Sequence, residues 1–175
     1  LNNVKVIRLT AQWIVEKRFG DAVQFKWYHL LAKAAELNDA KSMYDLANVF
    51  FYTKKKIRKG LILLNKAAEL NFPAAKLRLR EVVLSNLEDD VNPRLARSNE
   101  LLLEAVSLGD AHAMYVYAFQ LLFGALYDGE SRERVLHWFR LAANAGFDVA
   151  SDIIAQIEQS LQTSYASDTC NEIFP

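Results

Sequence analysis

Three histidines, one cysteine and one closely spaced Glu–His pair are the residues whose types could support catalysis or metal binding. The histidines are His29, His112 and His137, and the cysteine is Cys170. Glu133 and His137 stand four residues apart, a spacing that places both side chains on one helix face and suits two metal ligands. No third ligand stands nearby in the sequence, so an ordinary surface pair explains Glu133 and His137 better than a metal site does.

Nucleophilic and nucleotide-binding motifs are missing from the sequence. No G-x-S-x-G nucleophile elbow occurs. Cys170 could be a reactive thiol, although a tail residue without chemistry is the simpler interpretation. Gly124, Asp128 and Gly129 do not fit the phosphate-binding pattern G-x-x-x-x-G-K-[ST], and glycines that connect helices explain them. We therefore predict that the chain is not an enzyme and binds no cofactor or metal ion.

Basic residues cluster at 54–59 (KKKIRK) and 76–80 (KLRLR), and an acidic stretch follows at 88–90 (EDD). A basic patch could steer an acidic partner to the protein. The alternative is a solvated loop and helix face that the acidic stretch neutralises. No aromatic residues interleave with this patch, and the chain carries 21 Lys and Arg against 21 Asp and Glu. Both observations argue against a nucleic-acid partner.

Length and composition are those of one globular domain. The chain has 175 residues, of which 52% are hydrophobic and 24% charged. Apolar runs are far shorter than the roughly 20 residues that span a bilayer, so we predict no membrane span. A single cysteine excludes an intrachain disulfide. The compartment is left open between periplasm and cytoplasm, and the first residue, Leu1 rather than Met, favours the periplasm.

A nine-residue segment that recurs along the chain indicates how the structure is built. Residues 30–38 (LLAKAAELN) return as 63–71 (LLNKAAELN), with weaker copies at 101–109 and 138–146. The last residues of these copies are 33, 38 and 37 positions apart. Self-similarity at such a period is typical of stacked-repeat proteins, which mostly offer extended surfaces to partners.

Each nonamer reads as a helix end followed by a turn into the next helix. The closing residues, Asn or Gly, tolerate the left-handed backbone that ends a helix, and an Asp follows three of them where an N-cap belongs. Pro73 fits the first turn of a new helix. We predict helical pairs at 4–18 with 21–37, 40–53 with 56–70, 73–87 with 94–108, and 111–127 with 131–145. A last helix at 148–162 and an irregular tail at 163–175 complete the chain, so that one domain covers residues 1–162.

Two further patterns repeat with the nonamer. Small residues stand four and nine positions after the turns, where paired helices must approach closely; the set is Ser42, Ala75, Ala113 and Ala150, then Ala47, Ala118 and Ala155. Arg80 breaks this rule. A cation stands twelve positions before each turn, at Lys26, Lys59, Arg97 and Arg134.

These residues resemble the Sel1-like repeat family, a relative of the tetratricopeptide repeats. The matching pieces are residues 33–36 and 66–69 (both KAAE), 113–118 (AMYVYA), the spaced cations, and Trp138 with Phe139. The family's glycine-rich loop is absent, and residues 53–56, 92–94 and 129–131 stand in its place. The resemblance covers about residues 5–160. It implies a right-handed α-α superhelix, an all-α solenoid of about four repeats, that acts as an adaptor or scaffold without catalysis.

Residues seven, ten and fourteen positions after each turn form a stripe that we expect to face away from the packed side of its helix. In tetratricopeptide-like solenoids this helix lines the concave side. We therefore predict a partner-binding stripe that includes Asp45, Asn48, Tyr52, Arg78, Glu81, Phe119, Phe123 and Gln156. The alternative is that Phe119 and Phe123 belong to the core.

The sequence thus predicts a non-catalytic module that binds another protein or peptide. Its two versions are an adaptor and an immunity protein that neutralises a secreted bacterial toxin or effector, as the resemblance implies for several bacterial family members. A hidden enzyme or small-ligand site is a third possibility. It would need convergent polar residues, which the sequence does not offer at suitable spacing.

Overall fold

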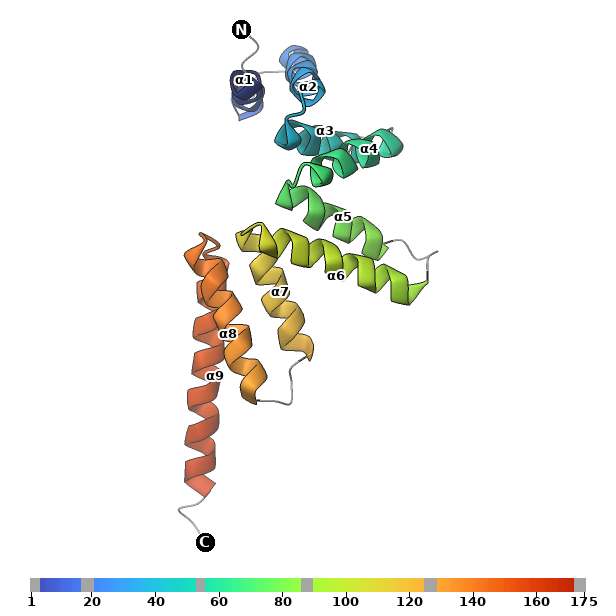
Figure 1. Cartoon of the computed structure of the whole chain (residues 1–175). Coiled ribbons are helices and arrows are strands. Elements are labelled where there is room, and N and C mark those ends of the chain that lie inside the picture. Colours follow the sequence, from blue (N-terminus) through green and yellow to red (C-terminus); the bar gives the residue numbers. More distant parts are fainter. Residues whose placement is uncertain (1–3, 17–20, 53–55, 86–89, 125–128, 172–175) are drawn as a thin grey trace. The chain divides into compact units, whose positions relative to one another are not determined.

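The computed structural model of the protein describes residues 4–16, 21–52, 56–85, 90–124 and 129–171. Helices connected by short turns and loops make up all of this described part, without a strand (Figure 1). The all-α fold predicted from the sequence is therefore confirmed. The helices are α1 (Val4–Glu16), α2 (Asp21–Glu36), α3 (Ala40–Tyr52), α4 (Ile57–Glu69), α5 (Pro73–Ser85), α6 (Val91–Ser107), α7 (Ala111–Gly124), α8 (Gly129–Asn144) and α9 (Val149–Asn171).

The last helix is longer than the sequence predicts. α9 continues to Asn171, which replaces the irregular tail expected from residue 163 onward; residues 172–175 lie outside the described part. No Gly or Pro occurs between Val149 and Asn171, so nothing interrupts the backbone hydrogen bonds once the helix has started.

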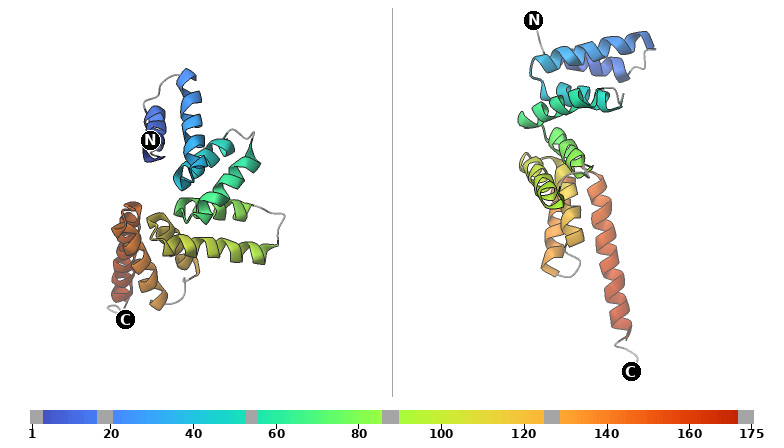
Figure 2. Two further views of the ribbon diagram at one scale, coloured as in Figure 1. Left: turned by 45° about the horizontal axis from the view of Figure 1, so that its top comes forward. Right: turned by 90° about the vertical axis from the view of Figure 1, so that its right-hand side faces the viewer.

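The chain divides into two compact units, residues 1–105 and 106–175. In the first unit, α1 packs on α2, α2 on α3, α3 on α4, and α4 on α5; in the second, α8 packs on both α7 and α9 (Figure 2). Within each unit the helices thus pack in chain order, as expected of stacked repeats. That one domain covers residues 1–162 stays a prediction.

Each unit has its own apolar core. In the first unit, Leu31, Leu46 and Leu64 are buried among alanines of α2, α3 and α4. In the second, Phe139 and Val135 of α8 are fully buried, and aromatic side chains of α7 pack around them. The leucine at the second position of the first three nonamers and the alanines at the fifth therefore serve packing, whereas the leucine at the eighth position, Leu37, Leu70 and Leu108, is exposed.

Every nonamer ends in the turn that its last residue predicts. The Asn38 N–H donates to Ala35 O at 3.0 Å and the Asp39 N–H to Ala34 O at 3.2 Å, the two hydrogen bonds of a Schellman motif. The same pair recurs after α4 and α8. The closing residues all have a left-handed backbone: Asn38 (φ 61°), Asn71 (φ 57°), Gly109 (φ 78°) and Gly146 (φ 95°).

Two of the predicted aspartates cap the helices that follow the turns. Asp39 Oδ2 accepts hydrogen bonds from the Ser42 N–H at 2.9 Å and the Ser42 hydroxyl at 2.6 Å. Asp110 Oδ1 accepts one from the Ala113 N–H at 2.8 Å. Each carboxylate satisfies an N–H that the first turn of a helix leaves without an intrahelical partner. Turn and cap together fix where one helix ends and the next begins.

Small residues stand where helices meet. All four residues at the fourth position after the turns are fully buried, and so are Ala47 and Ala118 at the ninth. Ala155, however, is exposed on α9, and Arg80 is half-buried. Gly60 of α4 approaches α3 so closely that an added Cβ would lie 3.1 Å from Phe51 Cε1 and 3.2 Å from Ala47 O. The small-residue pattern therefore holds at both positions in α3 and α7, and at the fourth position alone in α5 and α9.

Candidate protein-interaction surface

The residues with catalytic potential are engaged in packing or ordinary surface contacts. His29 and His137 lie edge-on to their neighbours Tyr28 and Trp138, and His112 stacks on Phe147 with ring centroids 5.3 Å apart. Glu133 forms an ion pair with Arg140 at 3.9 Å. Across the described segments, no three His, Cys, Asp or Glu side chains gather as metal ligands would. Gly124 is the last residue of α7 and Gly129 the first of α8, whereas Asp128 and the side chain of Cys170 lie outside the described part.

The solvent exposure of the predicted stripe residues increases along α3. Asp45 and Asn48 are half-buried, whereas the Tyr52 side chain at the end of the helix is 86% exposed. Its neighbour Phe51, which the sequence analysis did not include, is half-buried and contacts the region of Gly60 in α4. The stripe therefore ends in two adjacent aromatic rings, one supported by packing and one open to solvent.

α5 places one charged side chain, Arg78, against the Phe51 ring. The Arg78 guanidinium lies over the Phe51 ring, 5.8 Å from its centroid, and also forms an ion pair with Glu81 one turn further along α5. A guanidinium over an aromatic face is attracted to the ring while its edge stays available for hydrogen bonds. Phe51 of α3 is thus in contact with Arg78 of α5 and connects the stripe residues of the two helices. We call Asp45, Asn48, Phe51, Tyr52, Arg78 and Glu81 the α3–α5 face.

Charged side chains near the start of α3 influence the ionisation of Asp45, the first residue of this face. Arg8 of α1 donates a hydrogen bond to Asp39 Oδ1 at 2.8 Å. Burial raises the pKa of the Asp45 carboxyl above its ordinary value, and Lys41 and Arg8 act in the opposite direction. On α5, burial lowers the pKa of the half-buried Arg80 guanidinium. Arg80 still remains charged at neutral pH because arginine starts from so high a pKa.

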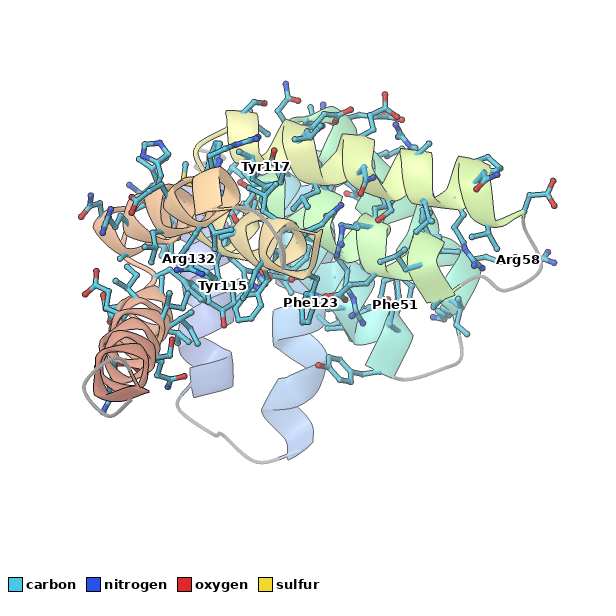
Figure 3. All side chains as sticks on the ribbon, turned by 90° about the horizontal axis from the view of Figure 1, so that it is seen from below. Phe51, Arg58, Tyr115, Tyr117, Phe123 and Arg132 are labelled. Atoms are coloured by element: carbon cyan, nitrogen blue, oxygen red, sulfur yellow. The ribbon has the colours of Figure 1, made fainter. Side chains whose placement is uncertain are left out.

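In the second unit, α7 carries the predicted aromatic residues. Phe119 packs edge-on to Phe139, with ring centroids 5.2 Å apart, and therefore belongs partly to the core. Phe123, one turn further, is 75% exposed, and Figure 3 labels it on α7. Gln156 on α9 is exposed. The alternative that both phenylalanines are core residues holds for Phe119 and fails for Phe123.

The basic patch of the first unit differs from its prediction at one residue. Lys56, Arg58 and Lys59 are exposed around the start of α4, and Figure 3 shows Arg58 pointing away from its helix. Lys76 instead is buried and donates to Glu104 Oε2 of α6 at 2.5 Å. Lys76 therefore belongs to the interior of the unit. Residues 54–55 and 88–89 lie outside the described part.

None of the described helices combines the length and the apolar character needed to cross a bilayer. The predicted stripe residues occupy two separate groups, one per unit, and each group includes one aromatic side chain that is largely exposed. Whether these groups line a concave side, as the sequence analysis expects, stays a prediction. Phe51 was missed because counting seven, ten and fourteen positions after the turn selects one side chain per turn and omits its neighbour.

Among the solved structures with a similar fold are three proteins from bacteria. They are a Sel1 repeat protein from Oxalobacter formigenes (TM-score 0.69, 17% identity, 89% of this chain and 63% of that chain), a protective antigen with an SLR fold from uropathogenic Escherichia coli strains (TM-score 0.63, 19% identity, 91% and 34%), and an immunity protein from Pseudomonas aeruginosa (TM-score 0.65, 18% identity, 86% and 55%).

These similarities confirm the Sel1-repeat fold that residues 33–36 and 66–69 predict. Neither a protein-family model nor a curated protein matches the sequence. The chain spans less than two thirds of each of the three similar structures. Fold is therefore what the comparisons establish.

Proposed function

We propose that this chain is a non-catalytic module that binds another protein through the α3–α5 face and the exposed end of α7. The observation that carries the proposal is the largely exposed Tyr52 ring at the end of α3, next in sequence to Phe51, whose own ring lies under Arg78. Tyr and Arg are enriched among the few residues that dominate binding energy at protein interfaces. A largely exposed tyrosine on a rigid helix contributes contact area with little loss of side-chain freedom.

Preorganisation supports the same proposal. Phe51 is held by α4 at Gly60, and Arg78 is held between Phe51 and Glu81, so the face keeps its shape before a partner arrives. Binding to such a surface avoids most of the entropy loss that ordering a flexible loop would bring. A helical repeat provides this rigidity without any dedicated binding loop.

Copurification with substituted chains tests the proposal. The tagged protein is isolated from its source cells, and the retained proteins are compared between the wild type and the variants Tyr52→Ala, Arg78→Ala and Phe123→Ala. We expect each variant to lose a partner that the wild type retains. Ile62→Ala, which removes an exposed apolar side chain of α4 outside the face, is the matched control. Equal retention by all three variants and the wild type would contradict the proposal and favour a structural spacer.

A second candidate function is toxin neutralisation. Its support is the structural similarity to the immunity protein from Pseudomonas aeruginosa. In this version the α3–α5 face binds a secreted toxin and blocks it sterically. Co-expression with the product of each adjacent gene tests it: rescue of growth from a toxic neighbour by the wild type, and loss of rescue with Tyr52→Ala, would favour this function over an adaptor role. If no neighbour is toxic, the adaptor function is favoured.

A further inference from the structure

The two units carry opposite formal charges. Residues 1–105 contain 18 Lys and Arg against 12 Asp and Glu, a formal charge of +6. Residues 106–175 contain 3 against 9, a formal charge of −6. The net charge of zero for the whole chain is thus the sum of a basic unit and an acidic unit. A charged partner is therefore attracted to one unit and repelled by the other.

Three of the cations in the basic unit stand together at the start of α4. Lys56, Arg58 and Lys59 are all exposed. The first turn of α4 contains no acidic residue, and its N-cap, Lys56, makes no side-chain capping hydrogen bond. The partial positive charge of the helix N-terminus adds to these three cations. We call Lys56, Arg58 and Lys59 the basic rim.

The basic rim adjoins the α3–α5 face. Lys56 Nζ lies 5.7 Å from the centroid of the Phe50 ring, next in sequence to Phe51. Gly60, one residue after the rim, lies against Phe51 itself. Lys56 is only four residues from Tyr52, so the chain keeps their Cα atoms within about 14 Å. A single bound segment can therefore reach the tyrosine and the rim together.

We propose that the α3–α5 face and the basic rim together bind an acidic segment of a partner protein. This inference rests on the proposed function and specifies the chemistry of the partner. An apolar or aromatic side chain of the segment packs on Tyr52, and its carboxylates lie over the basic rim. Charge complementarity of this kind raises the association rate and selects against basic partners.

Nucleic acid fits this surface less well than an acidic protein segment. Glu81 lies within the face, paired with Arg78, and would meet a phosphate of any strand that follows the arginine. The acidic unit of the same chain also repels a long polyphosphate. The basic rim is confined to the start of one helix, whereas single-strand binding needs a basic groove that follows the backbone. A short acidic peptide needs no such groove, because its few carboxylates can be confined to the three cations of the basic rim.

Fluorescence anisotropy with a labelled poly-glutamate peptide that carries a central tryptophan tests the inference. We expect the full chain to bind the peptide, and to bind it more weakly as salt is raised. The double substitution Arg58→Glu/Lys59→Glu should weaken binding roughly tenfold or more. It places acidic residues at a helix N-terminus, where they favour folding. Tyr52→Ala should also weaken binding.

The matched control is Lys5→Glu/Lys33→Glu, which changes the charge of the same unit equally at exposed positions of α1 and α2. This control should bind almost as the wild type does, and circular dichroism should show that both double variants are folded. Equal weakening of peptide binding by the two double variants would overturn the inference. The net charge of residues 1–105, rather than the α3–α5 face and the basic rim, would then explain binding.

Three other results would overturn it as well. One is failure of the peptide to bind while a copurifying protein is still lost with Tyr52→Ala, which would leave the proposed function intact. Another is tighter binding of a single-stranded oligonucleotide, weakened by the same rim variant, which would make nucleic acid the partner. The last is salt-dependent self-association in sedimentation that Arg58→Glu/Lys59→Glu abolishes, which would make a second copy of the chain the occupant.

Discussion

At the scale of single residues, Lys76 occupies a position where two other repeats have methionine. It stands five residues after its turn, as Met43 and Met114 do. Lys76 is nevertheless buried, and Glu104 of α6 supplies the carboxylate that the ammonium group needs. A buried charge is tolerable when it is paired, but its desolvation offsets much of the attraction. The pair therefore indicates specificity of the α5–α6 contact more than stability.

Substitution of the two partners should have unequal effects. Glu104→Gln keeps the shape but leaves the buried ammonium without its carboxylate, and we expect it to lower the free energy of unfolding by about 1–3 kcal/mol. Lys76→Met removes the charge together with its desolvation cost, and we expect stability equal to or above that of the wild type. Urea denaturation measures both. A larger loss with Lys76→Met than with Glu104→Gln would show that the ion pair is a net source of stability.

Asp45 provides a pH-dependent prediction. Burial raises its pKa, so the folded state binds the proton more tightly than the unfolded state does. The charged carboxylate therefore destabilises the fold, an effect that grows as pH rises through the raised pKa and is absent below the ordinary aspartate range. Asp45→Asn should thus stabilise the protein at neutral pH, and the gain over wild type should vanish in acid. Thermal unfolding at several pH values checks this. A stability gain of Asp45→Asn that is larger in acid than at neutral pH would contradict the prediction that the charged carboxylate destabilises the fold.

Sequence reasoning at this scale succeeds where a residue acts through its neighbours in the chain. The left-handed backbone of Asn38 and the capping role of Asp39 depend on local geometry and could be predicted. The partner of Lys76 is 28 residues away, and the ring under Arg78 belongs to another helix. A one-dimensional pattern contains no information on either contact. Lys76 was therefore assigned to a surface patch.

At the scale of secondary-structure elements, the turns that close the nonamers decide where helices stop. Gly109 has a φ of 78°, and a Cβ added there would meet no atom within 4 Å. A side chain at Gly109 would therefore destabilise the protein only through the left-handed backbone conformation that it would have to adopt, and not through a steric clash. Asparagine occupies the same position in two other turns, with φ values of 61° and 57°.

We therefore expect Gly109→Ala to destabilise the protein by about 1–2 kcal/mol, the cost of a left-handed backbone for an ordinary residue. Gly109→Asn should restore most of that loss, because asparagine hydrogen-bonds locally in this conformation. Denaturation midpoints of the two variants test the claim. Equal destabilisation by alanine and asparagine would show that the space around the residue matters after all.

Helix boundaries were predictable where a turn or cap marks them, and not where the mark is missing. The turns at 37–39 and 70–72 follow from the nonamers. Between Val149 and Asn171 no Gly, Pro or repeat copy indicates an end, and the predicted end at residue 162 lies about nine residues before the observed one at Asn171.

At the scale of the whole molecule, two units with separate cores should lose structure separately. Phe139 is fully buried in the second unit, and Leu64 is fully buried in the first. Truncation of a buried phenylalanine typically costs about 3–5 kcal/mol. In a repeat protein such a cost acts mainly on the unit that contains the residue and on its neighbours in the stack.

We expect Phe139→Ala to reduce hydrogen-exchange protection in α7, α8 and α9 while α2, α3 and α4 stay protected. Leu64→Ala should have the reverse effect. Mass spectrometry of exchanged fragments distinguishes the two patterns. Uniform loss of protection along the chain in both variants would mean that the two units unfold as one cooperative structure.

The self-contained turns have a consequence for how such a protein changes over generations. Each repeat of 33 to 38 residues includes the turn that ends its helix and, in two cases, an aspartate that caps the next helix. A gene duplication that copies one repeat therefore also copies the residues that set its helix boundaries. A new copy can then diverge at Tyr52-like or Arg78-like positions while the alanines and turn residues stay fixed. Recognition can in this way be altered by adding, losing or editing a single segment of the gene.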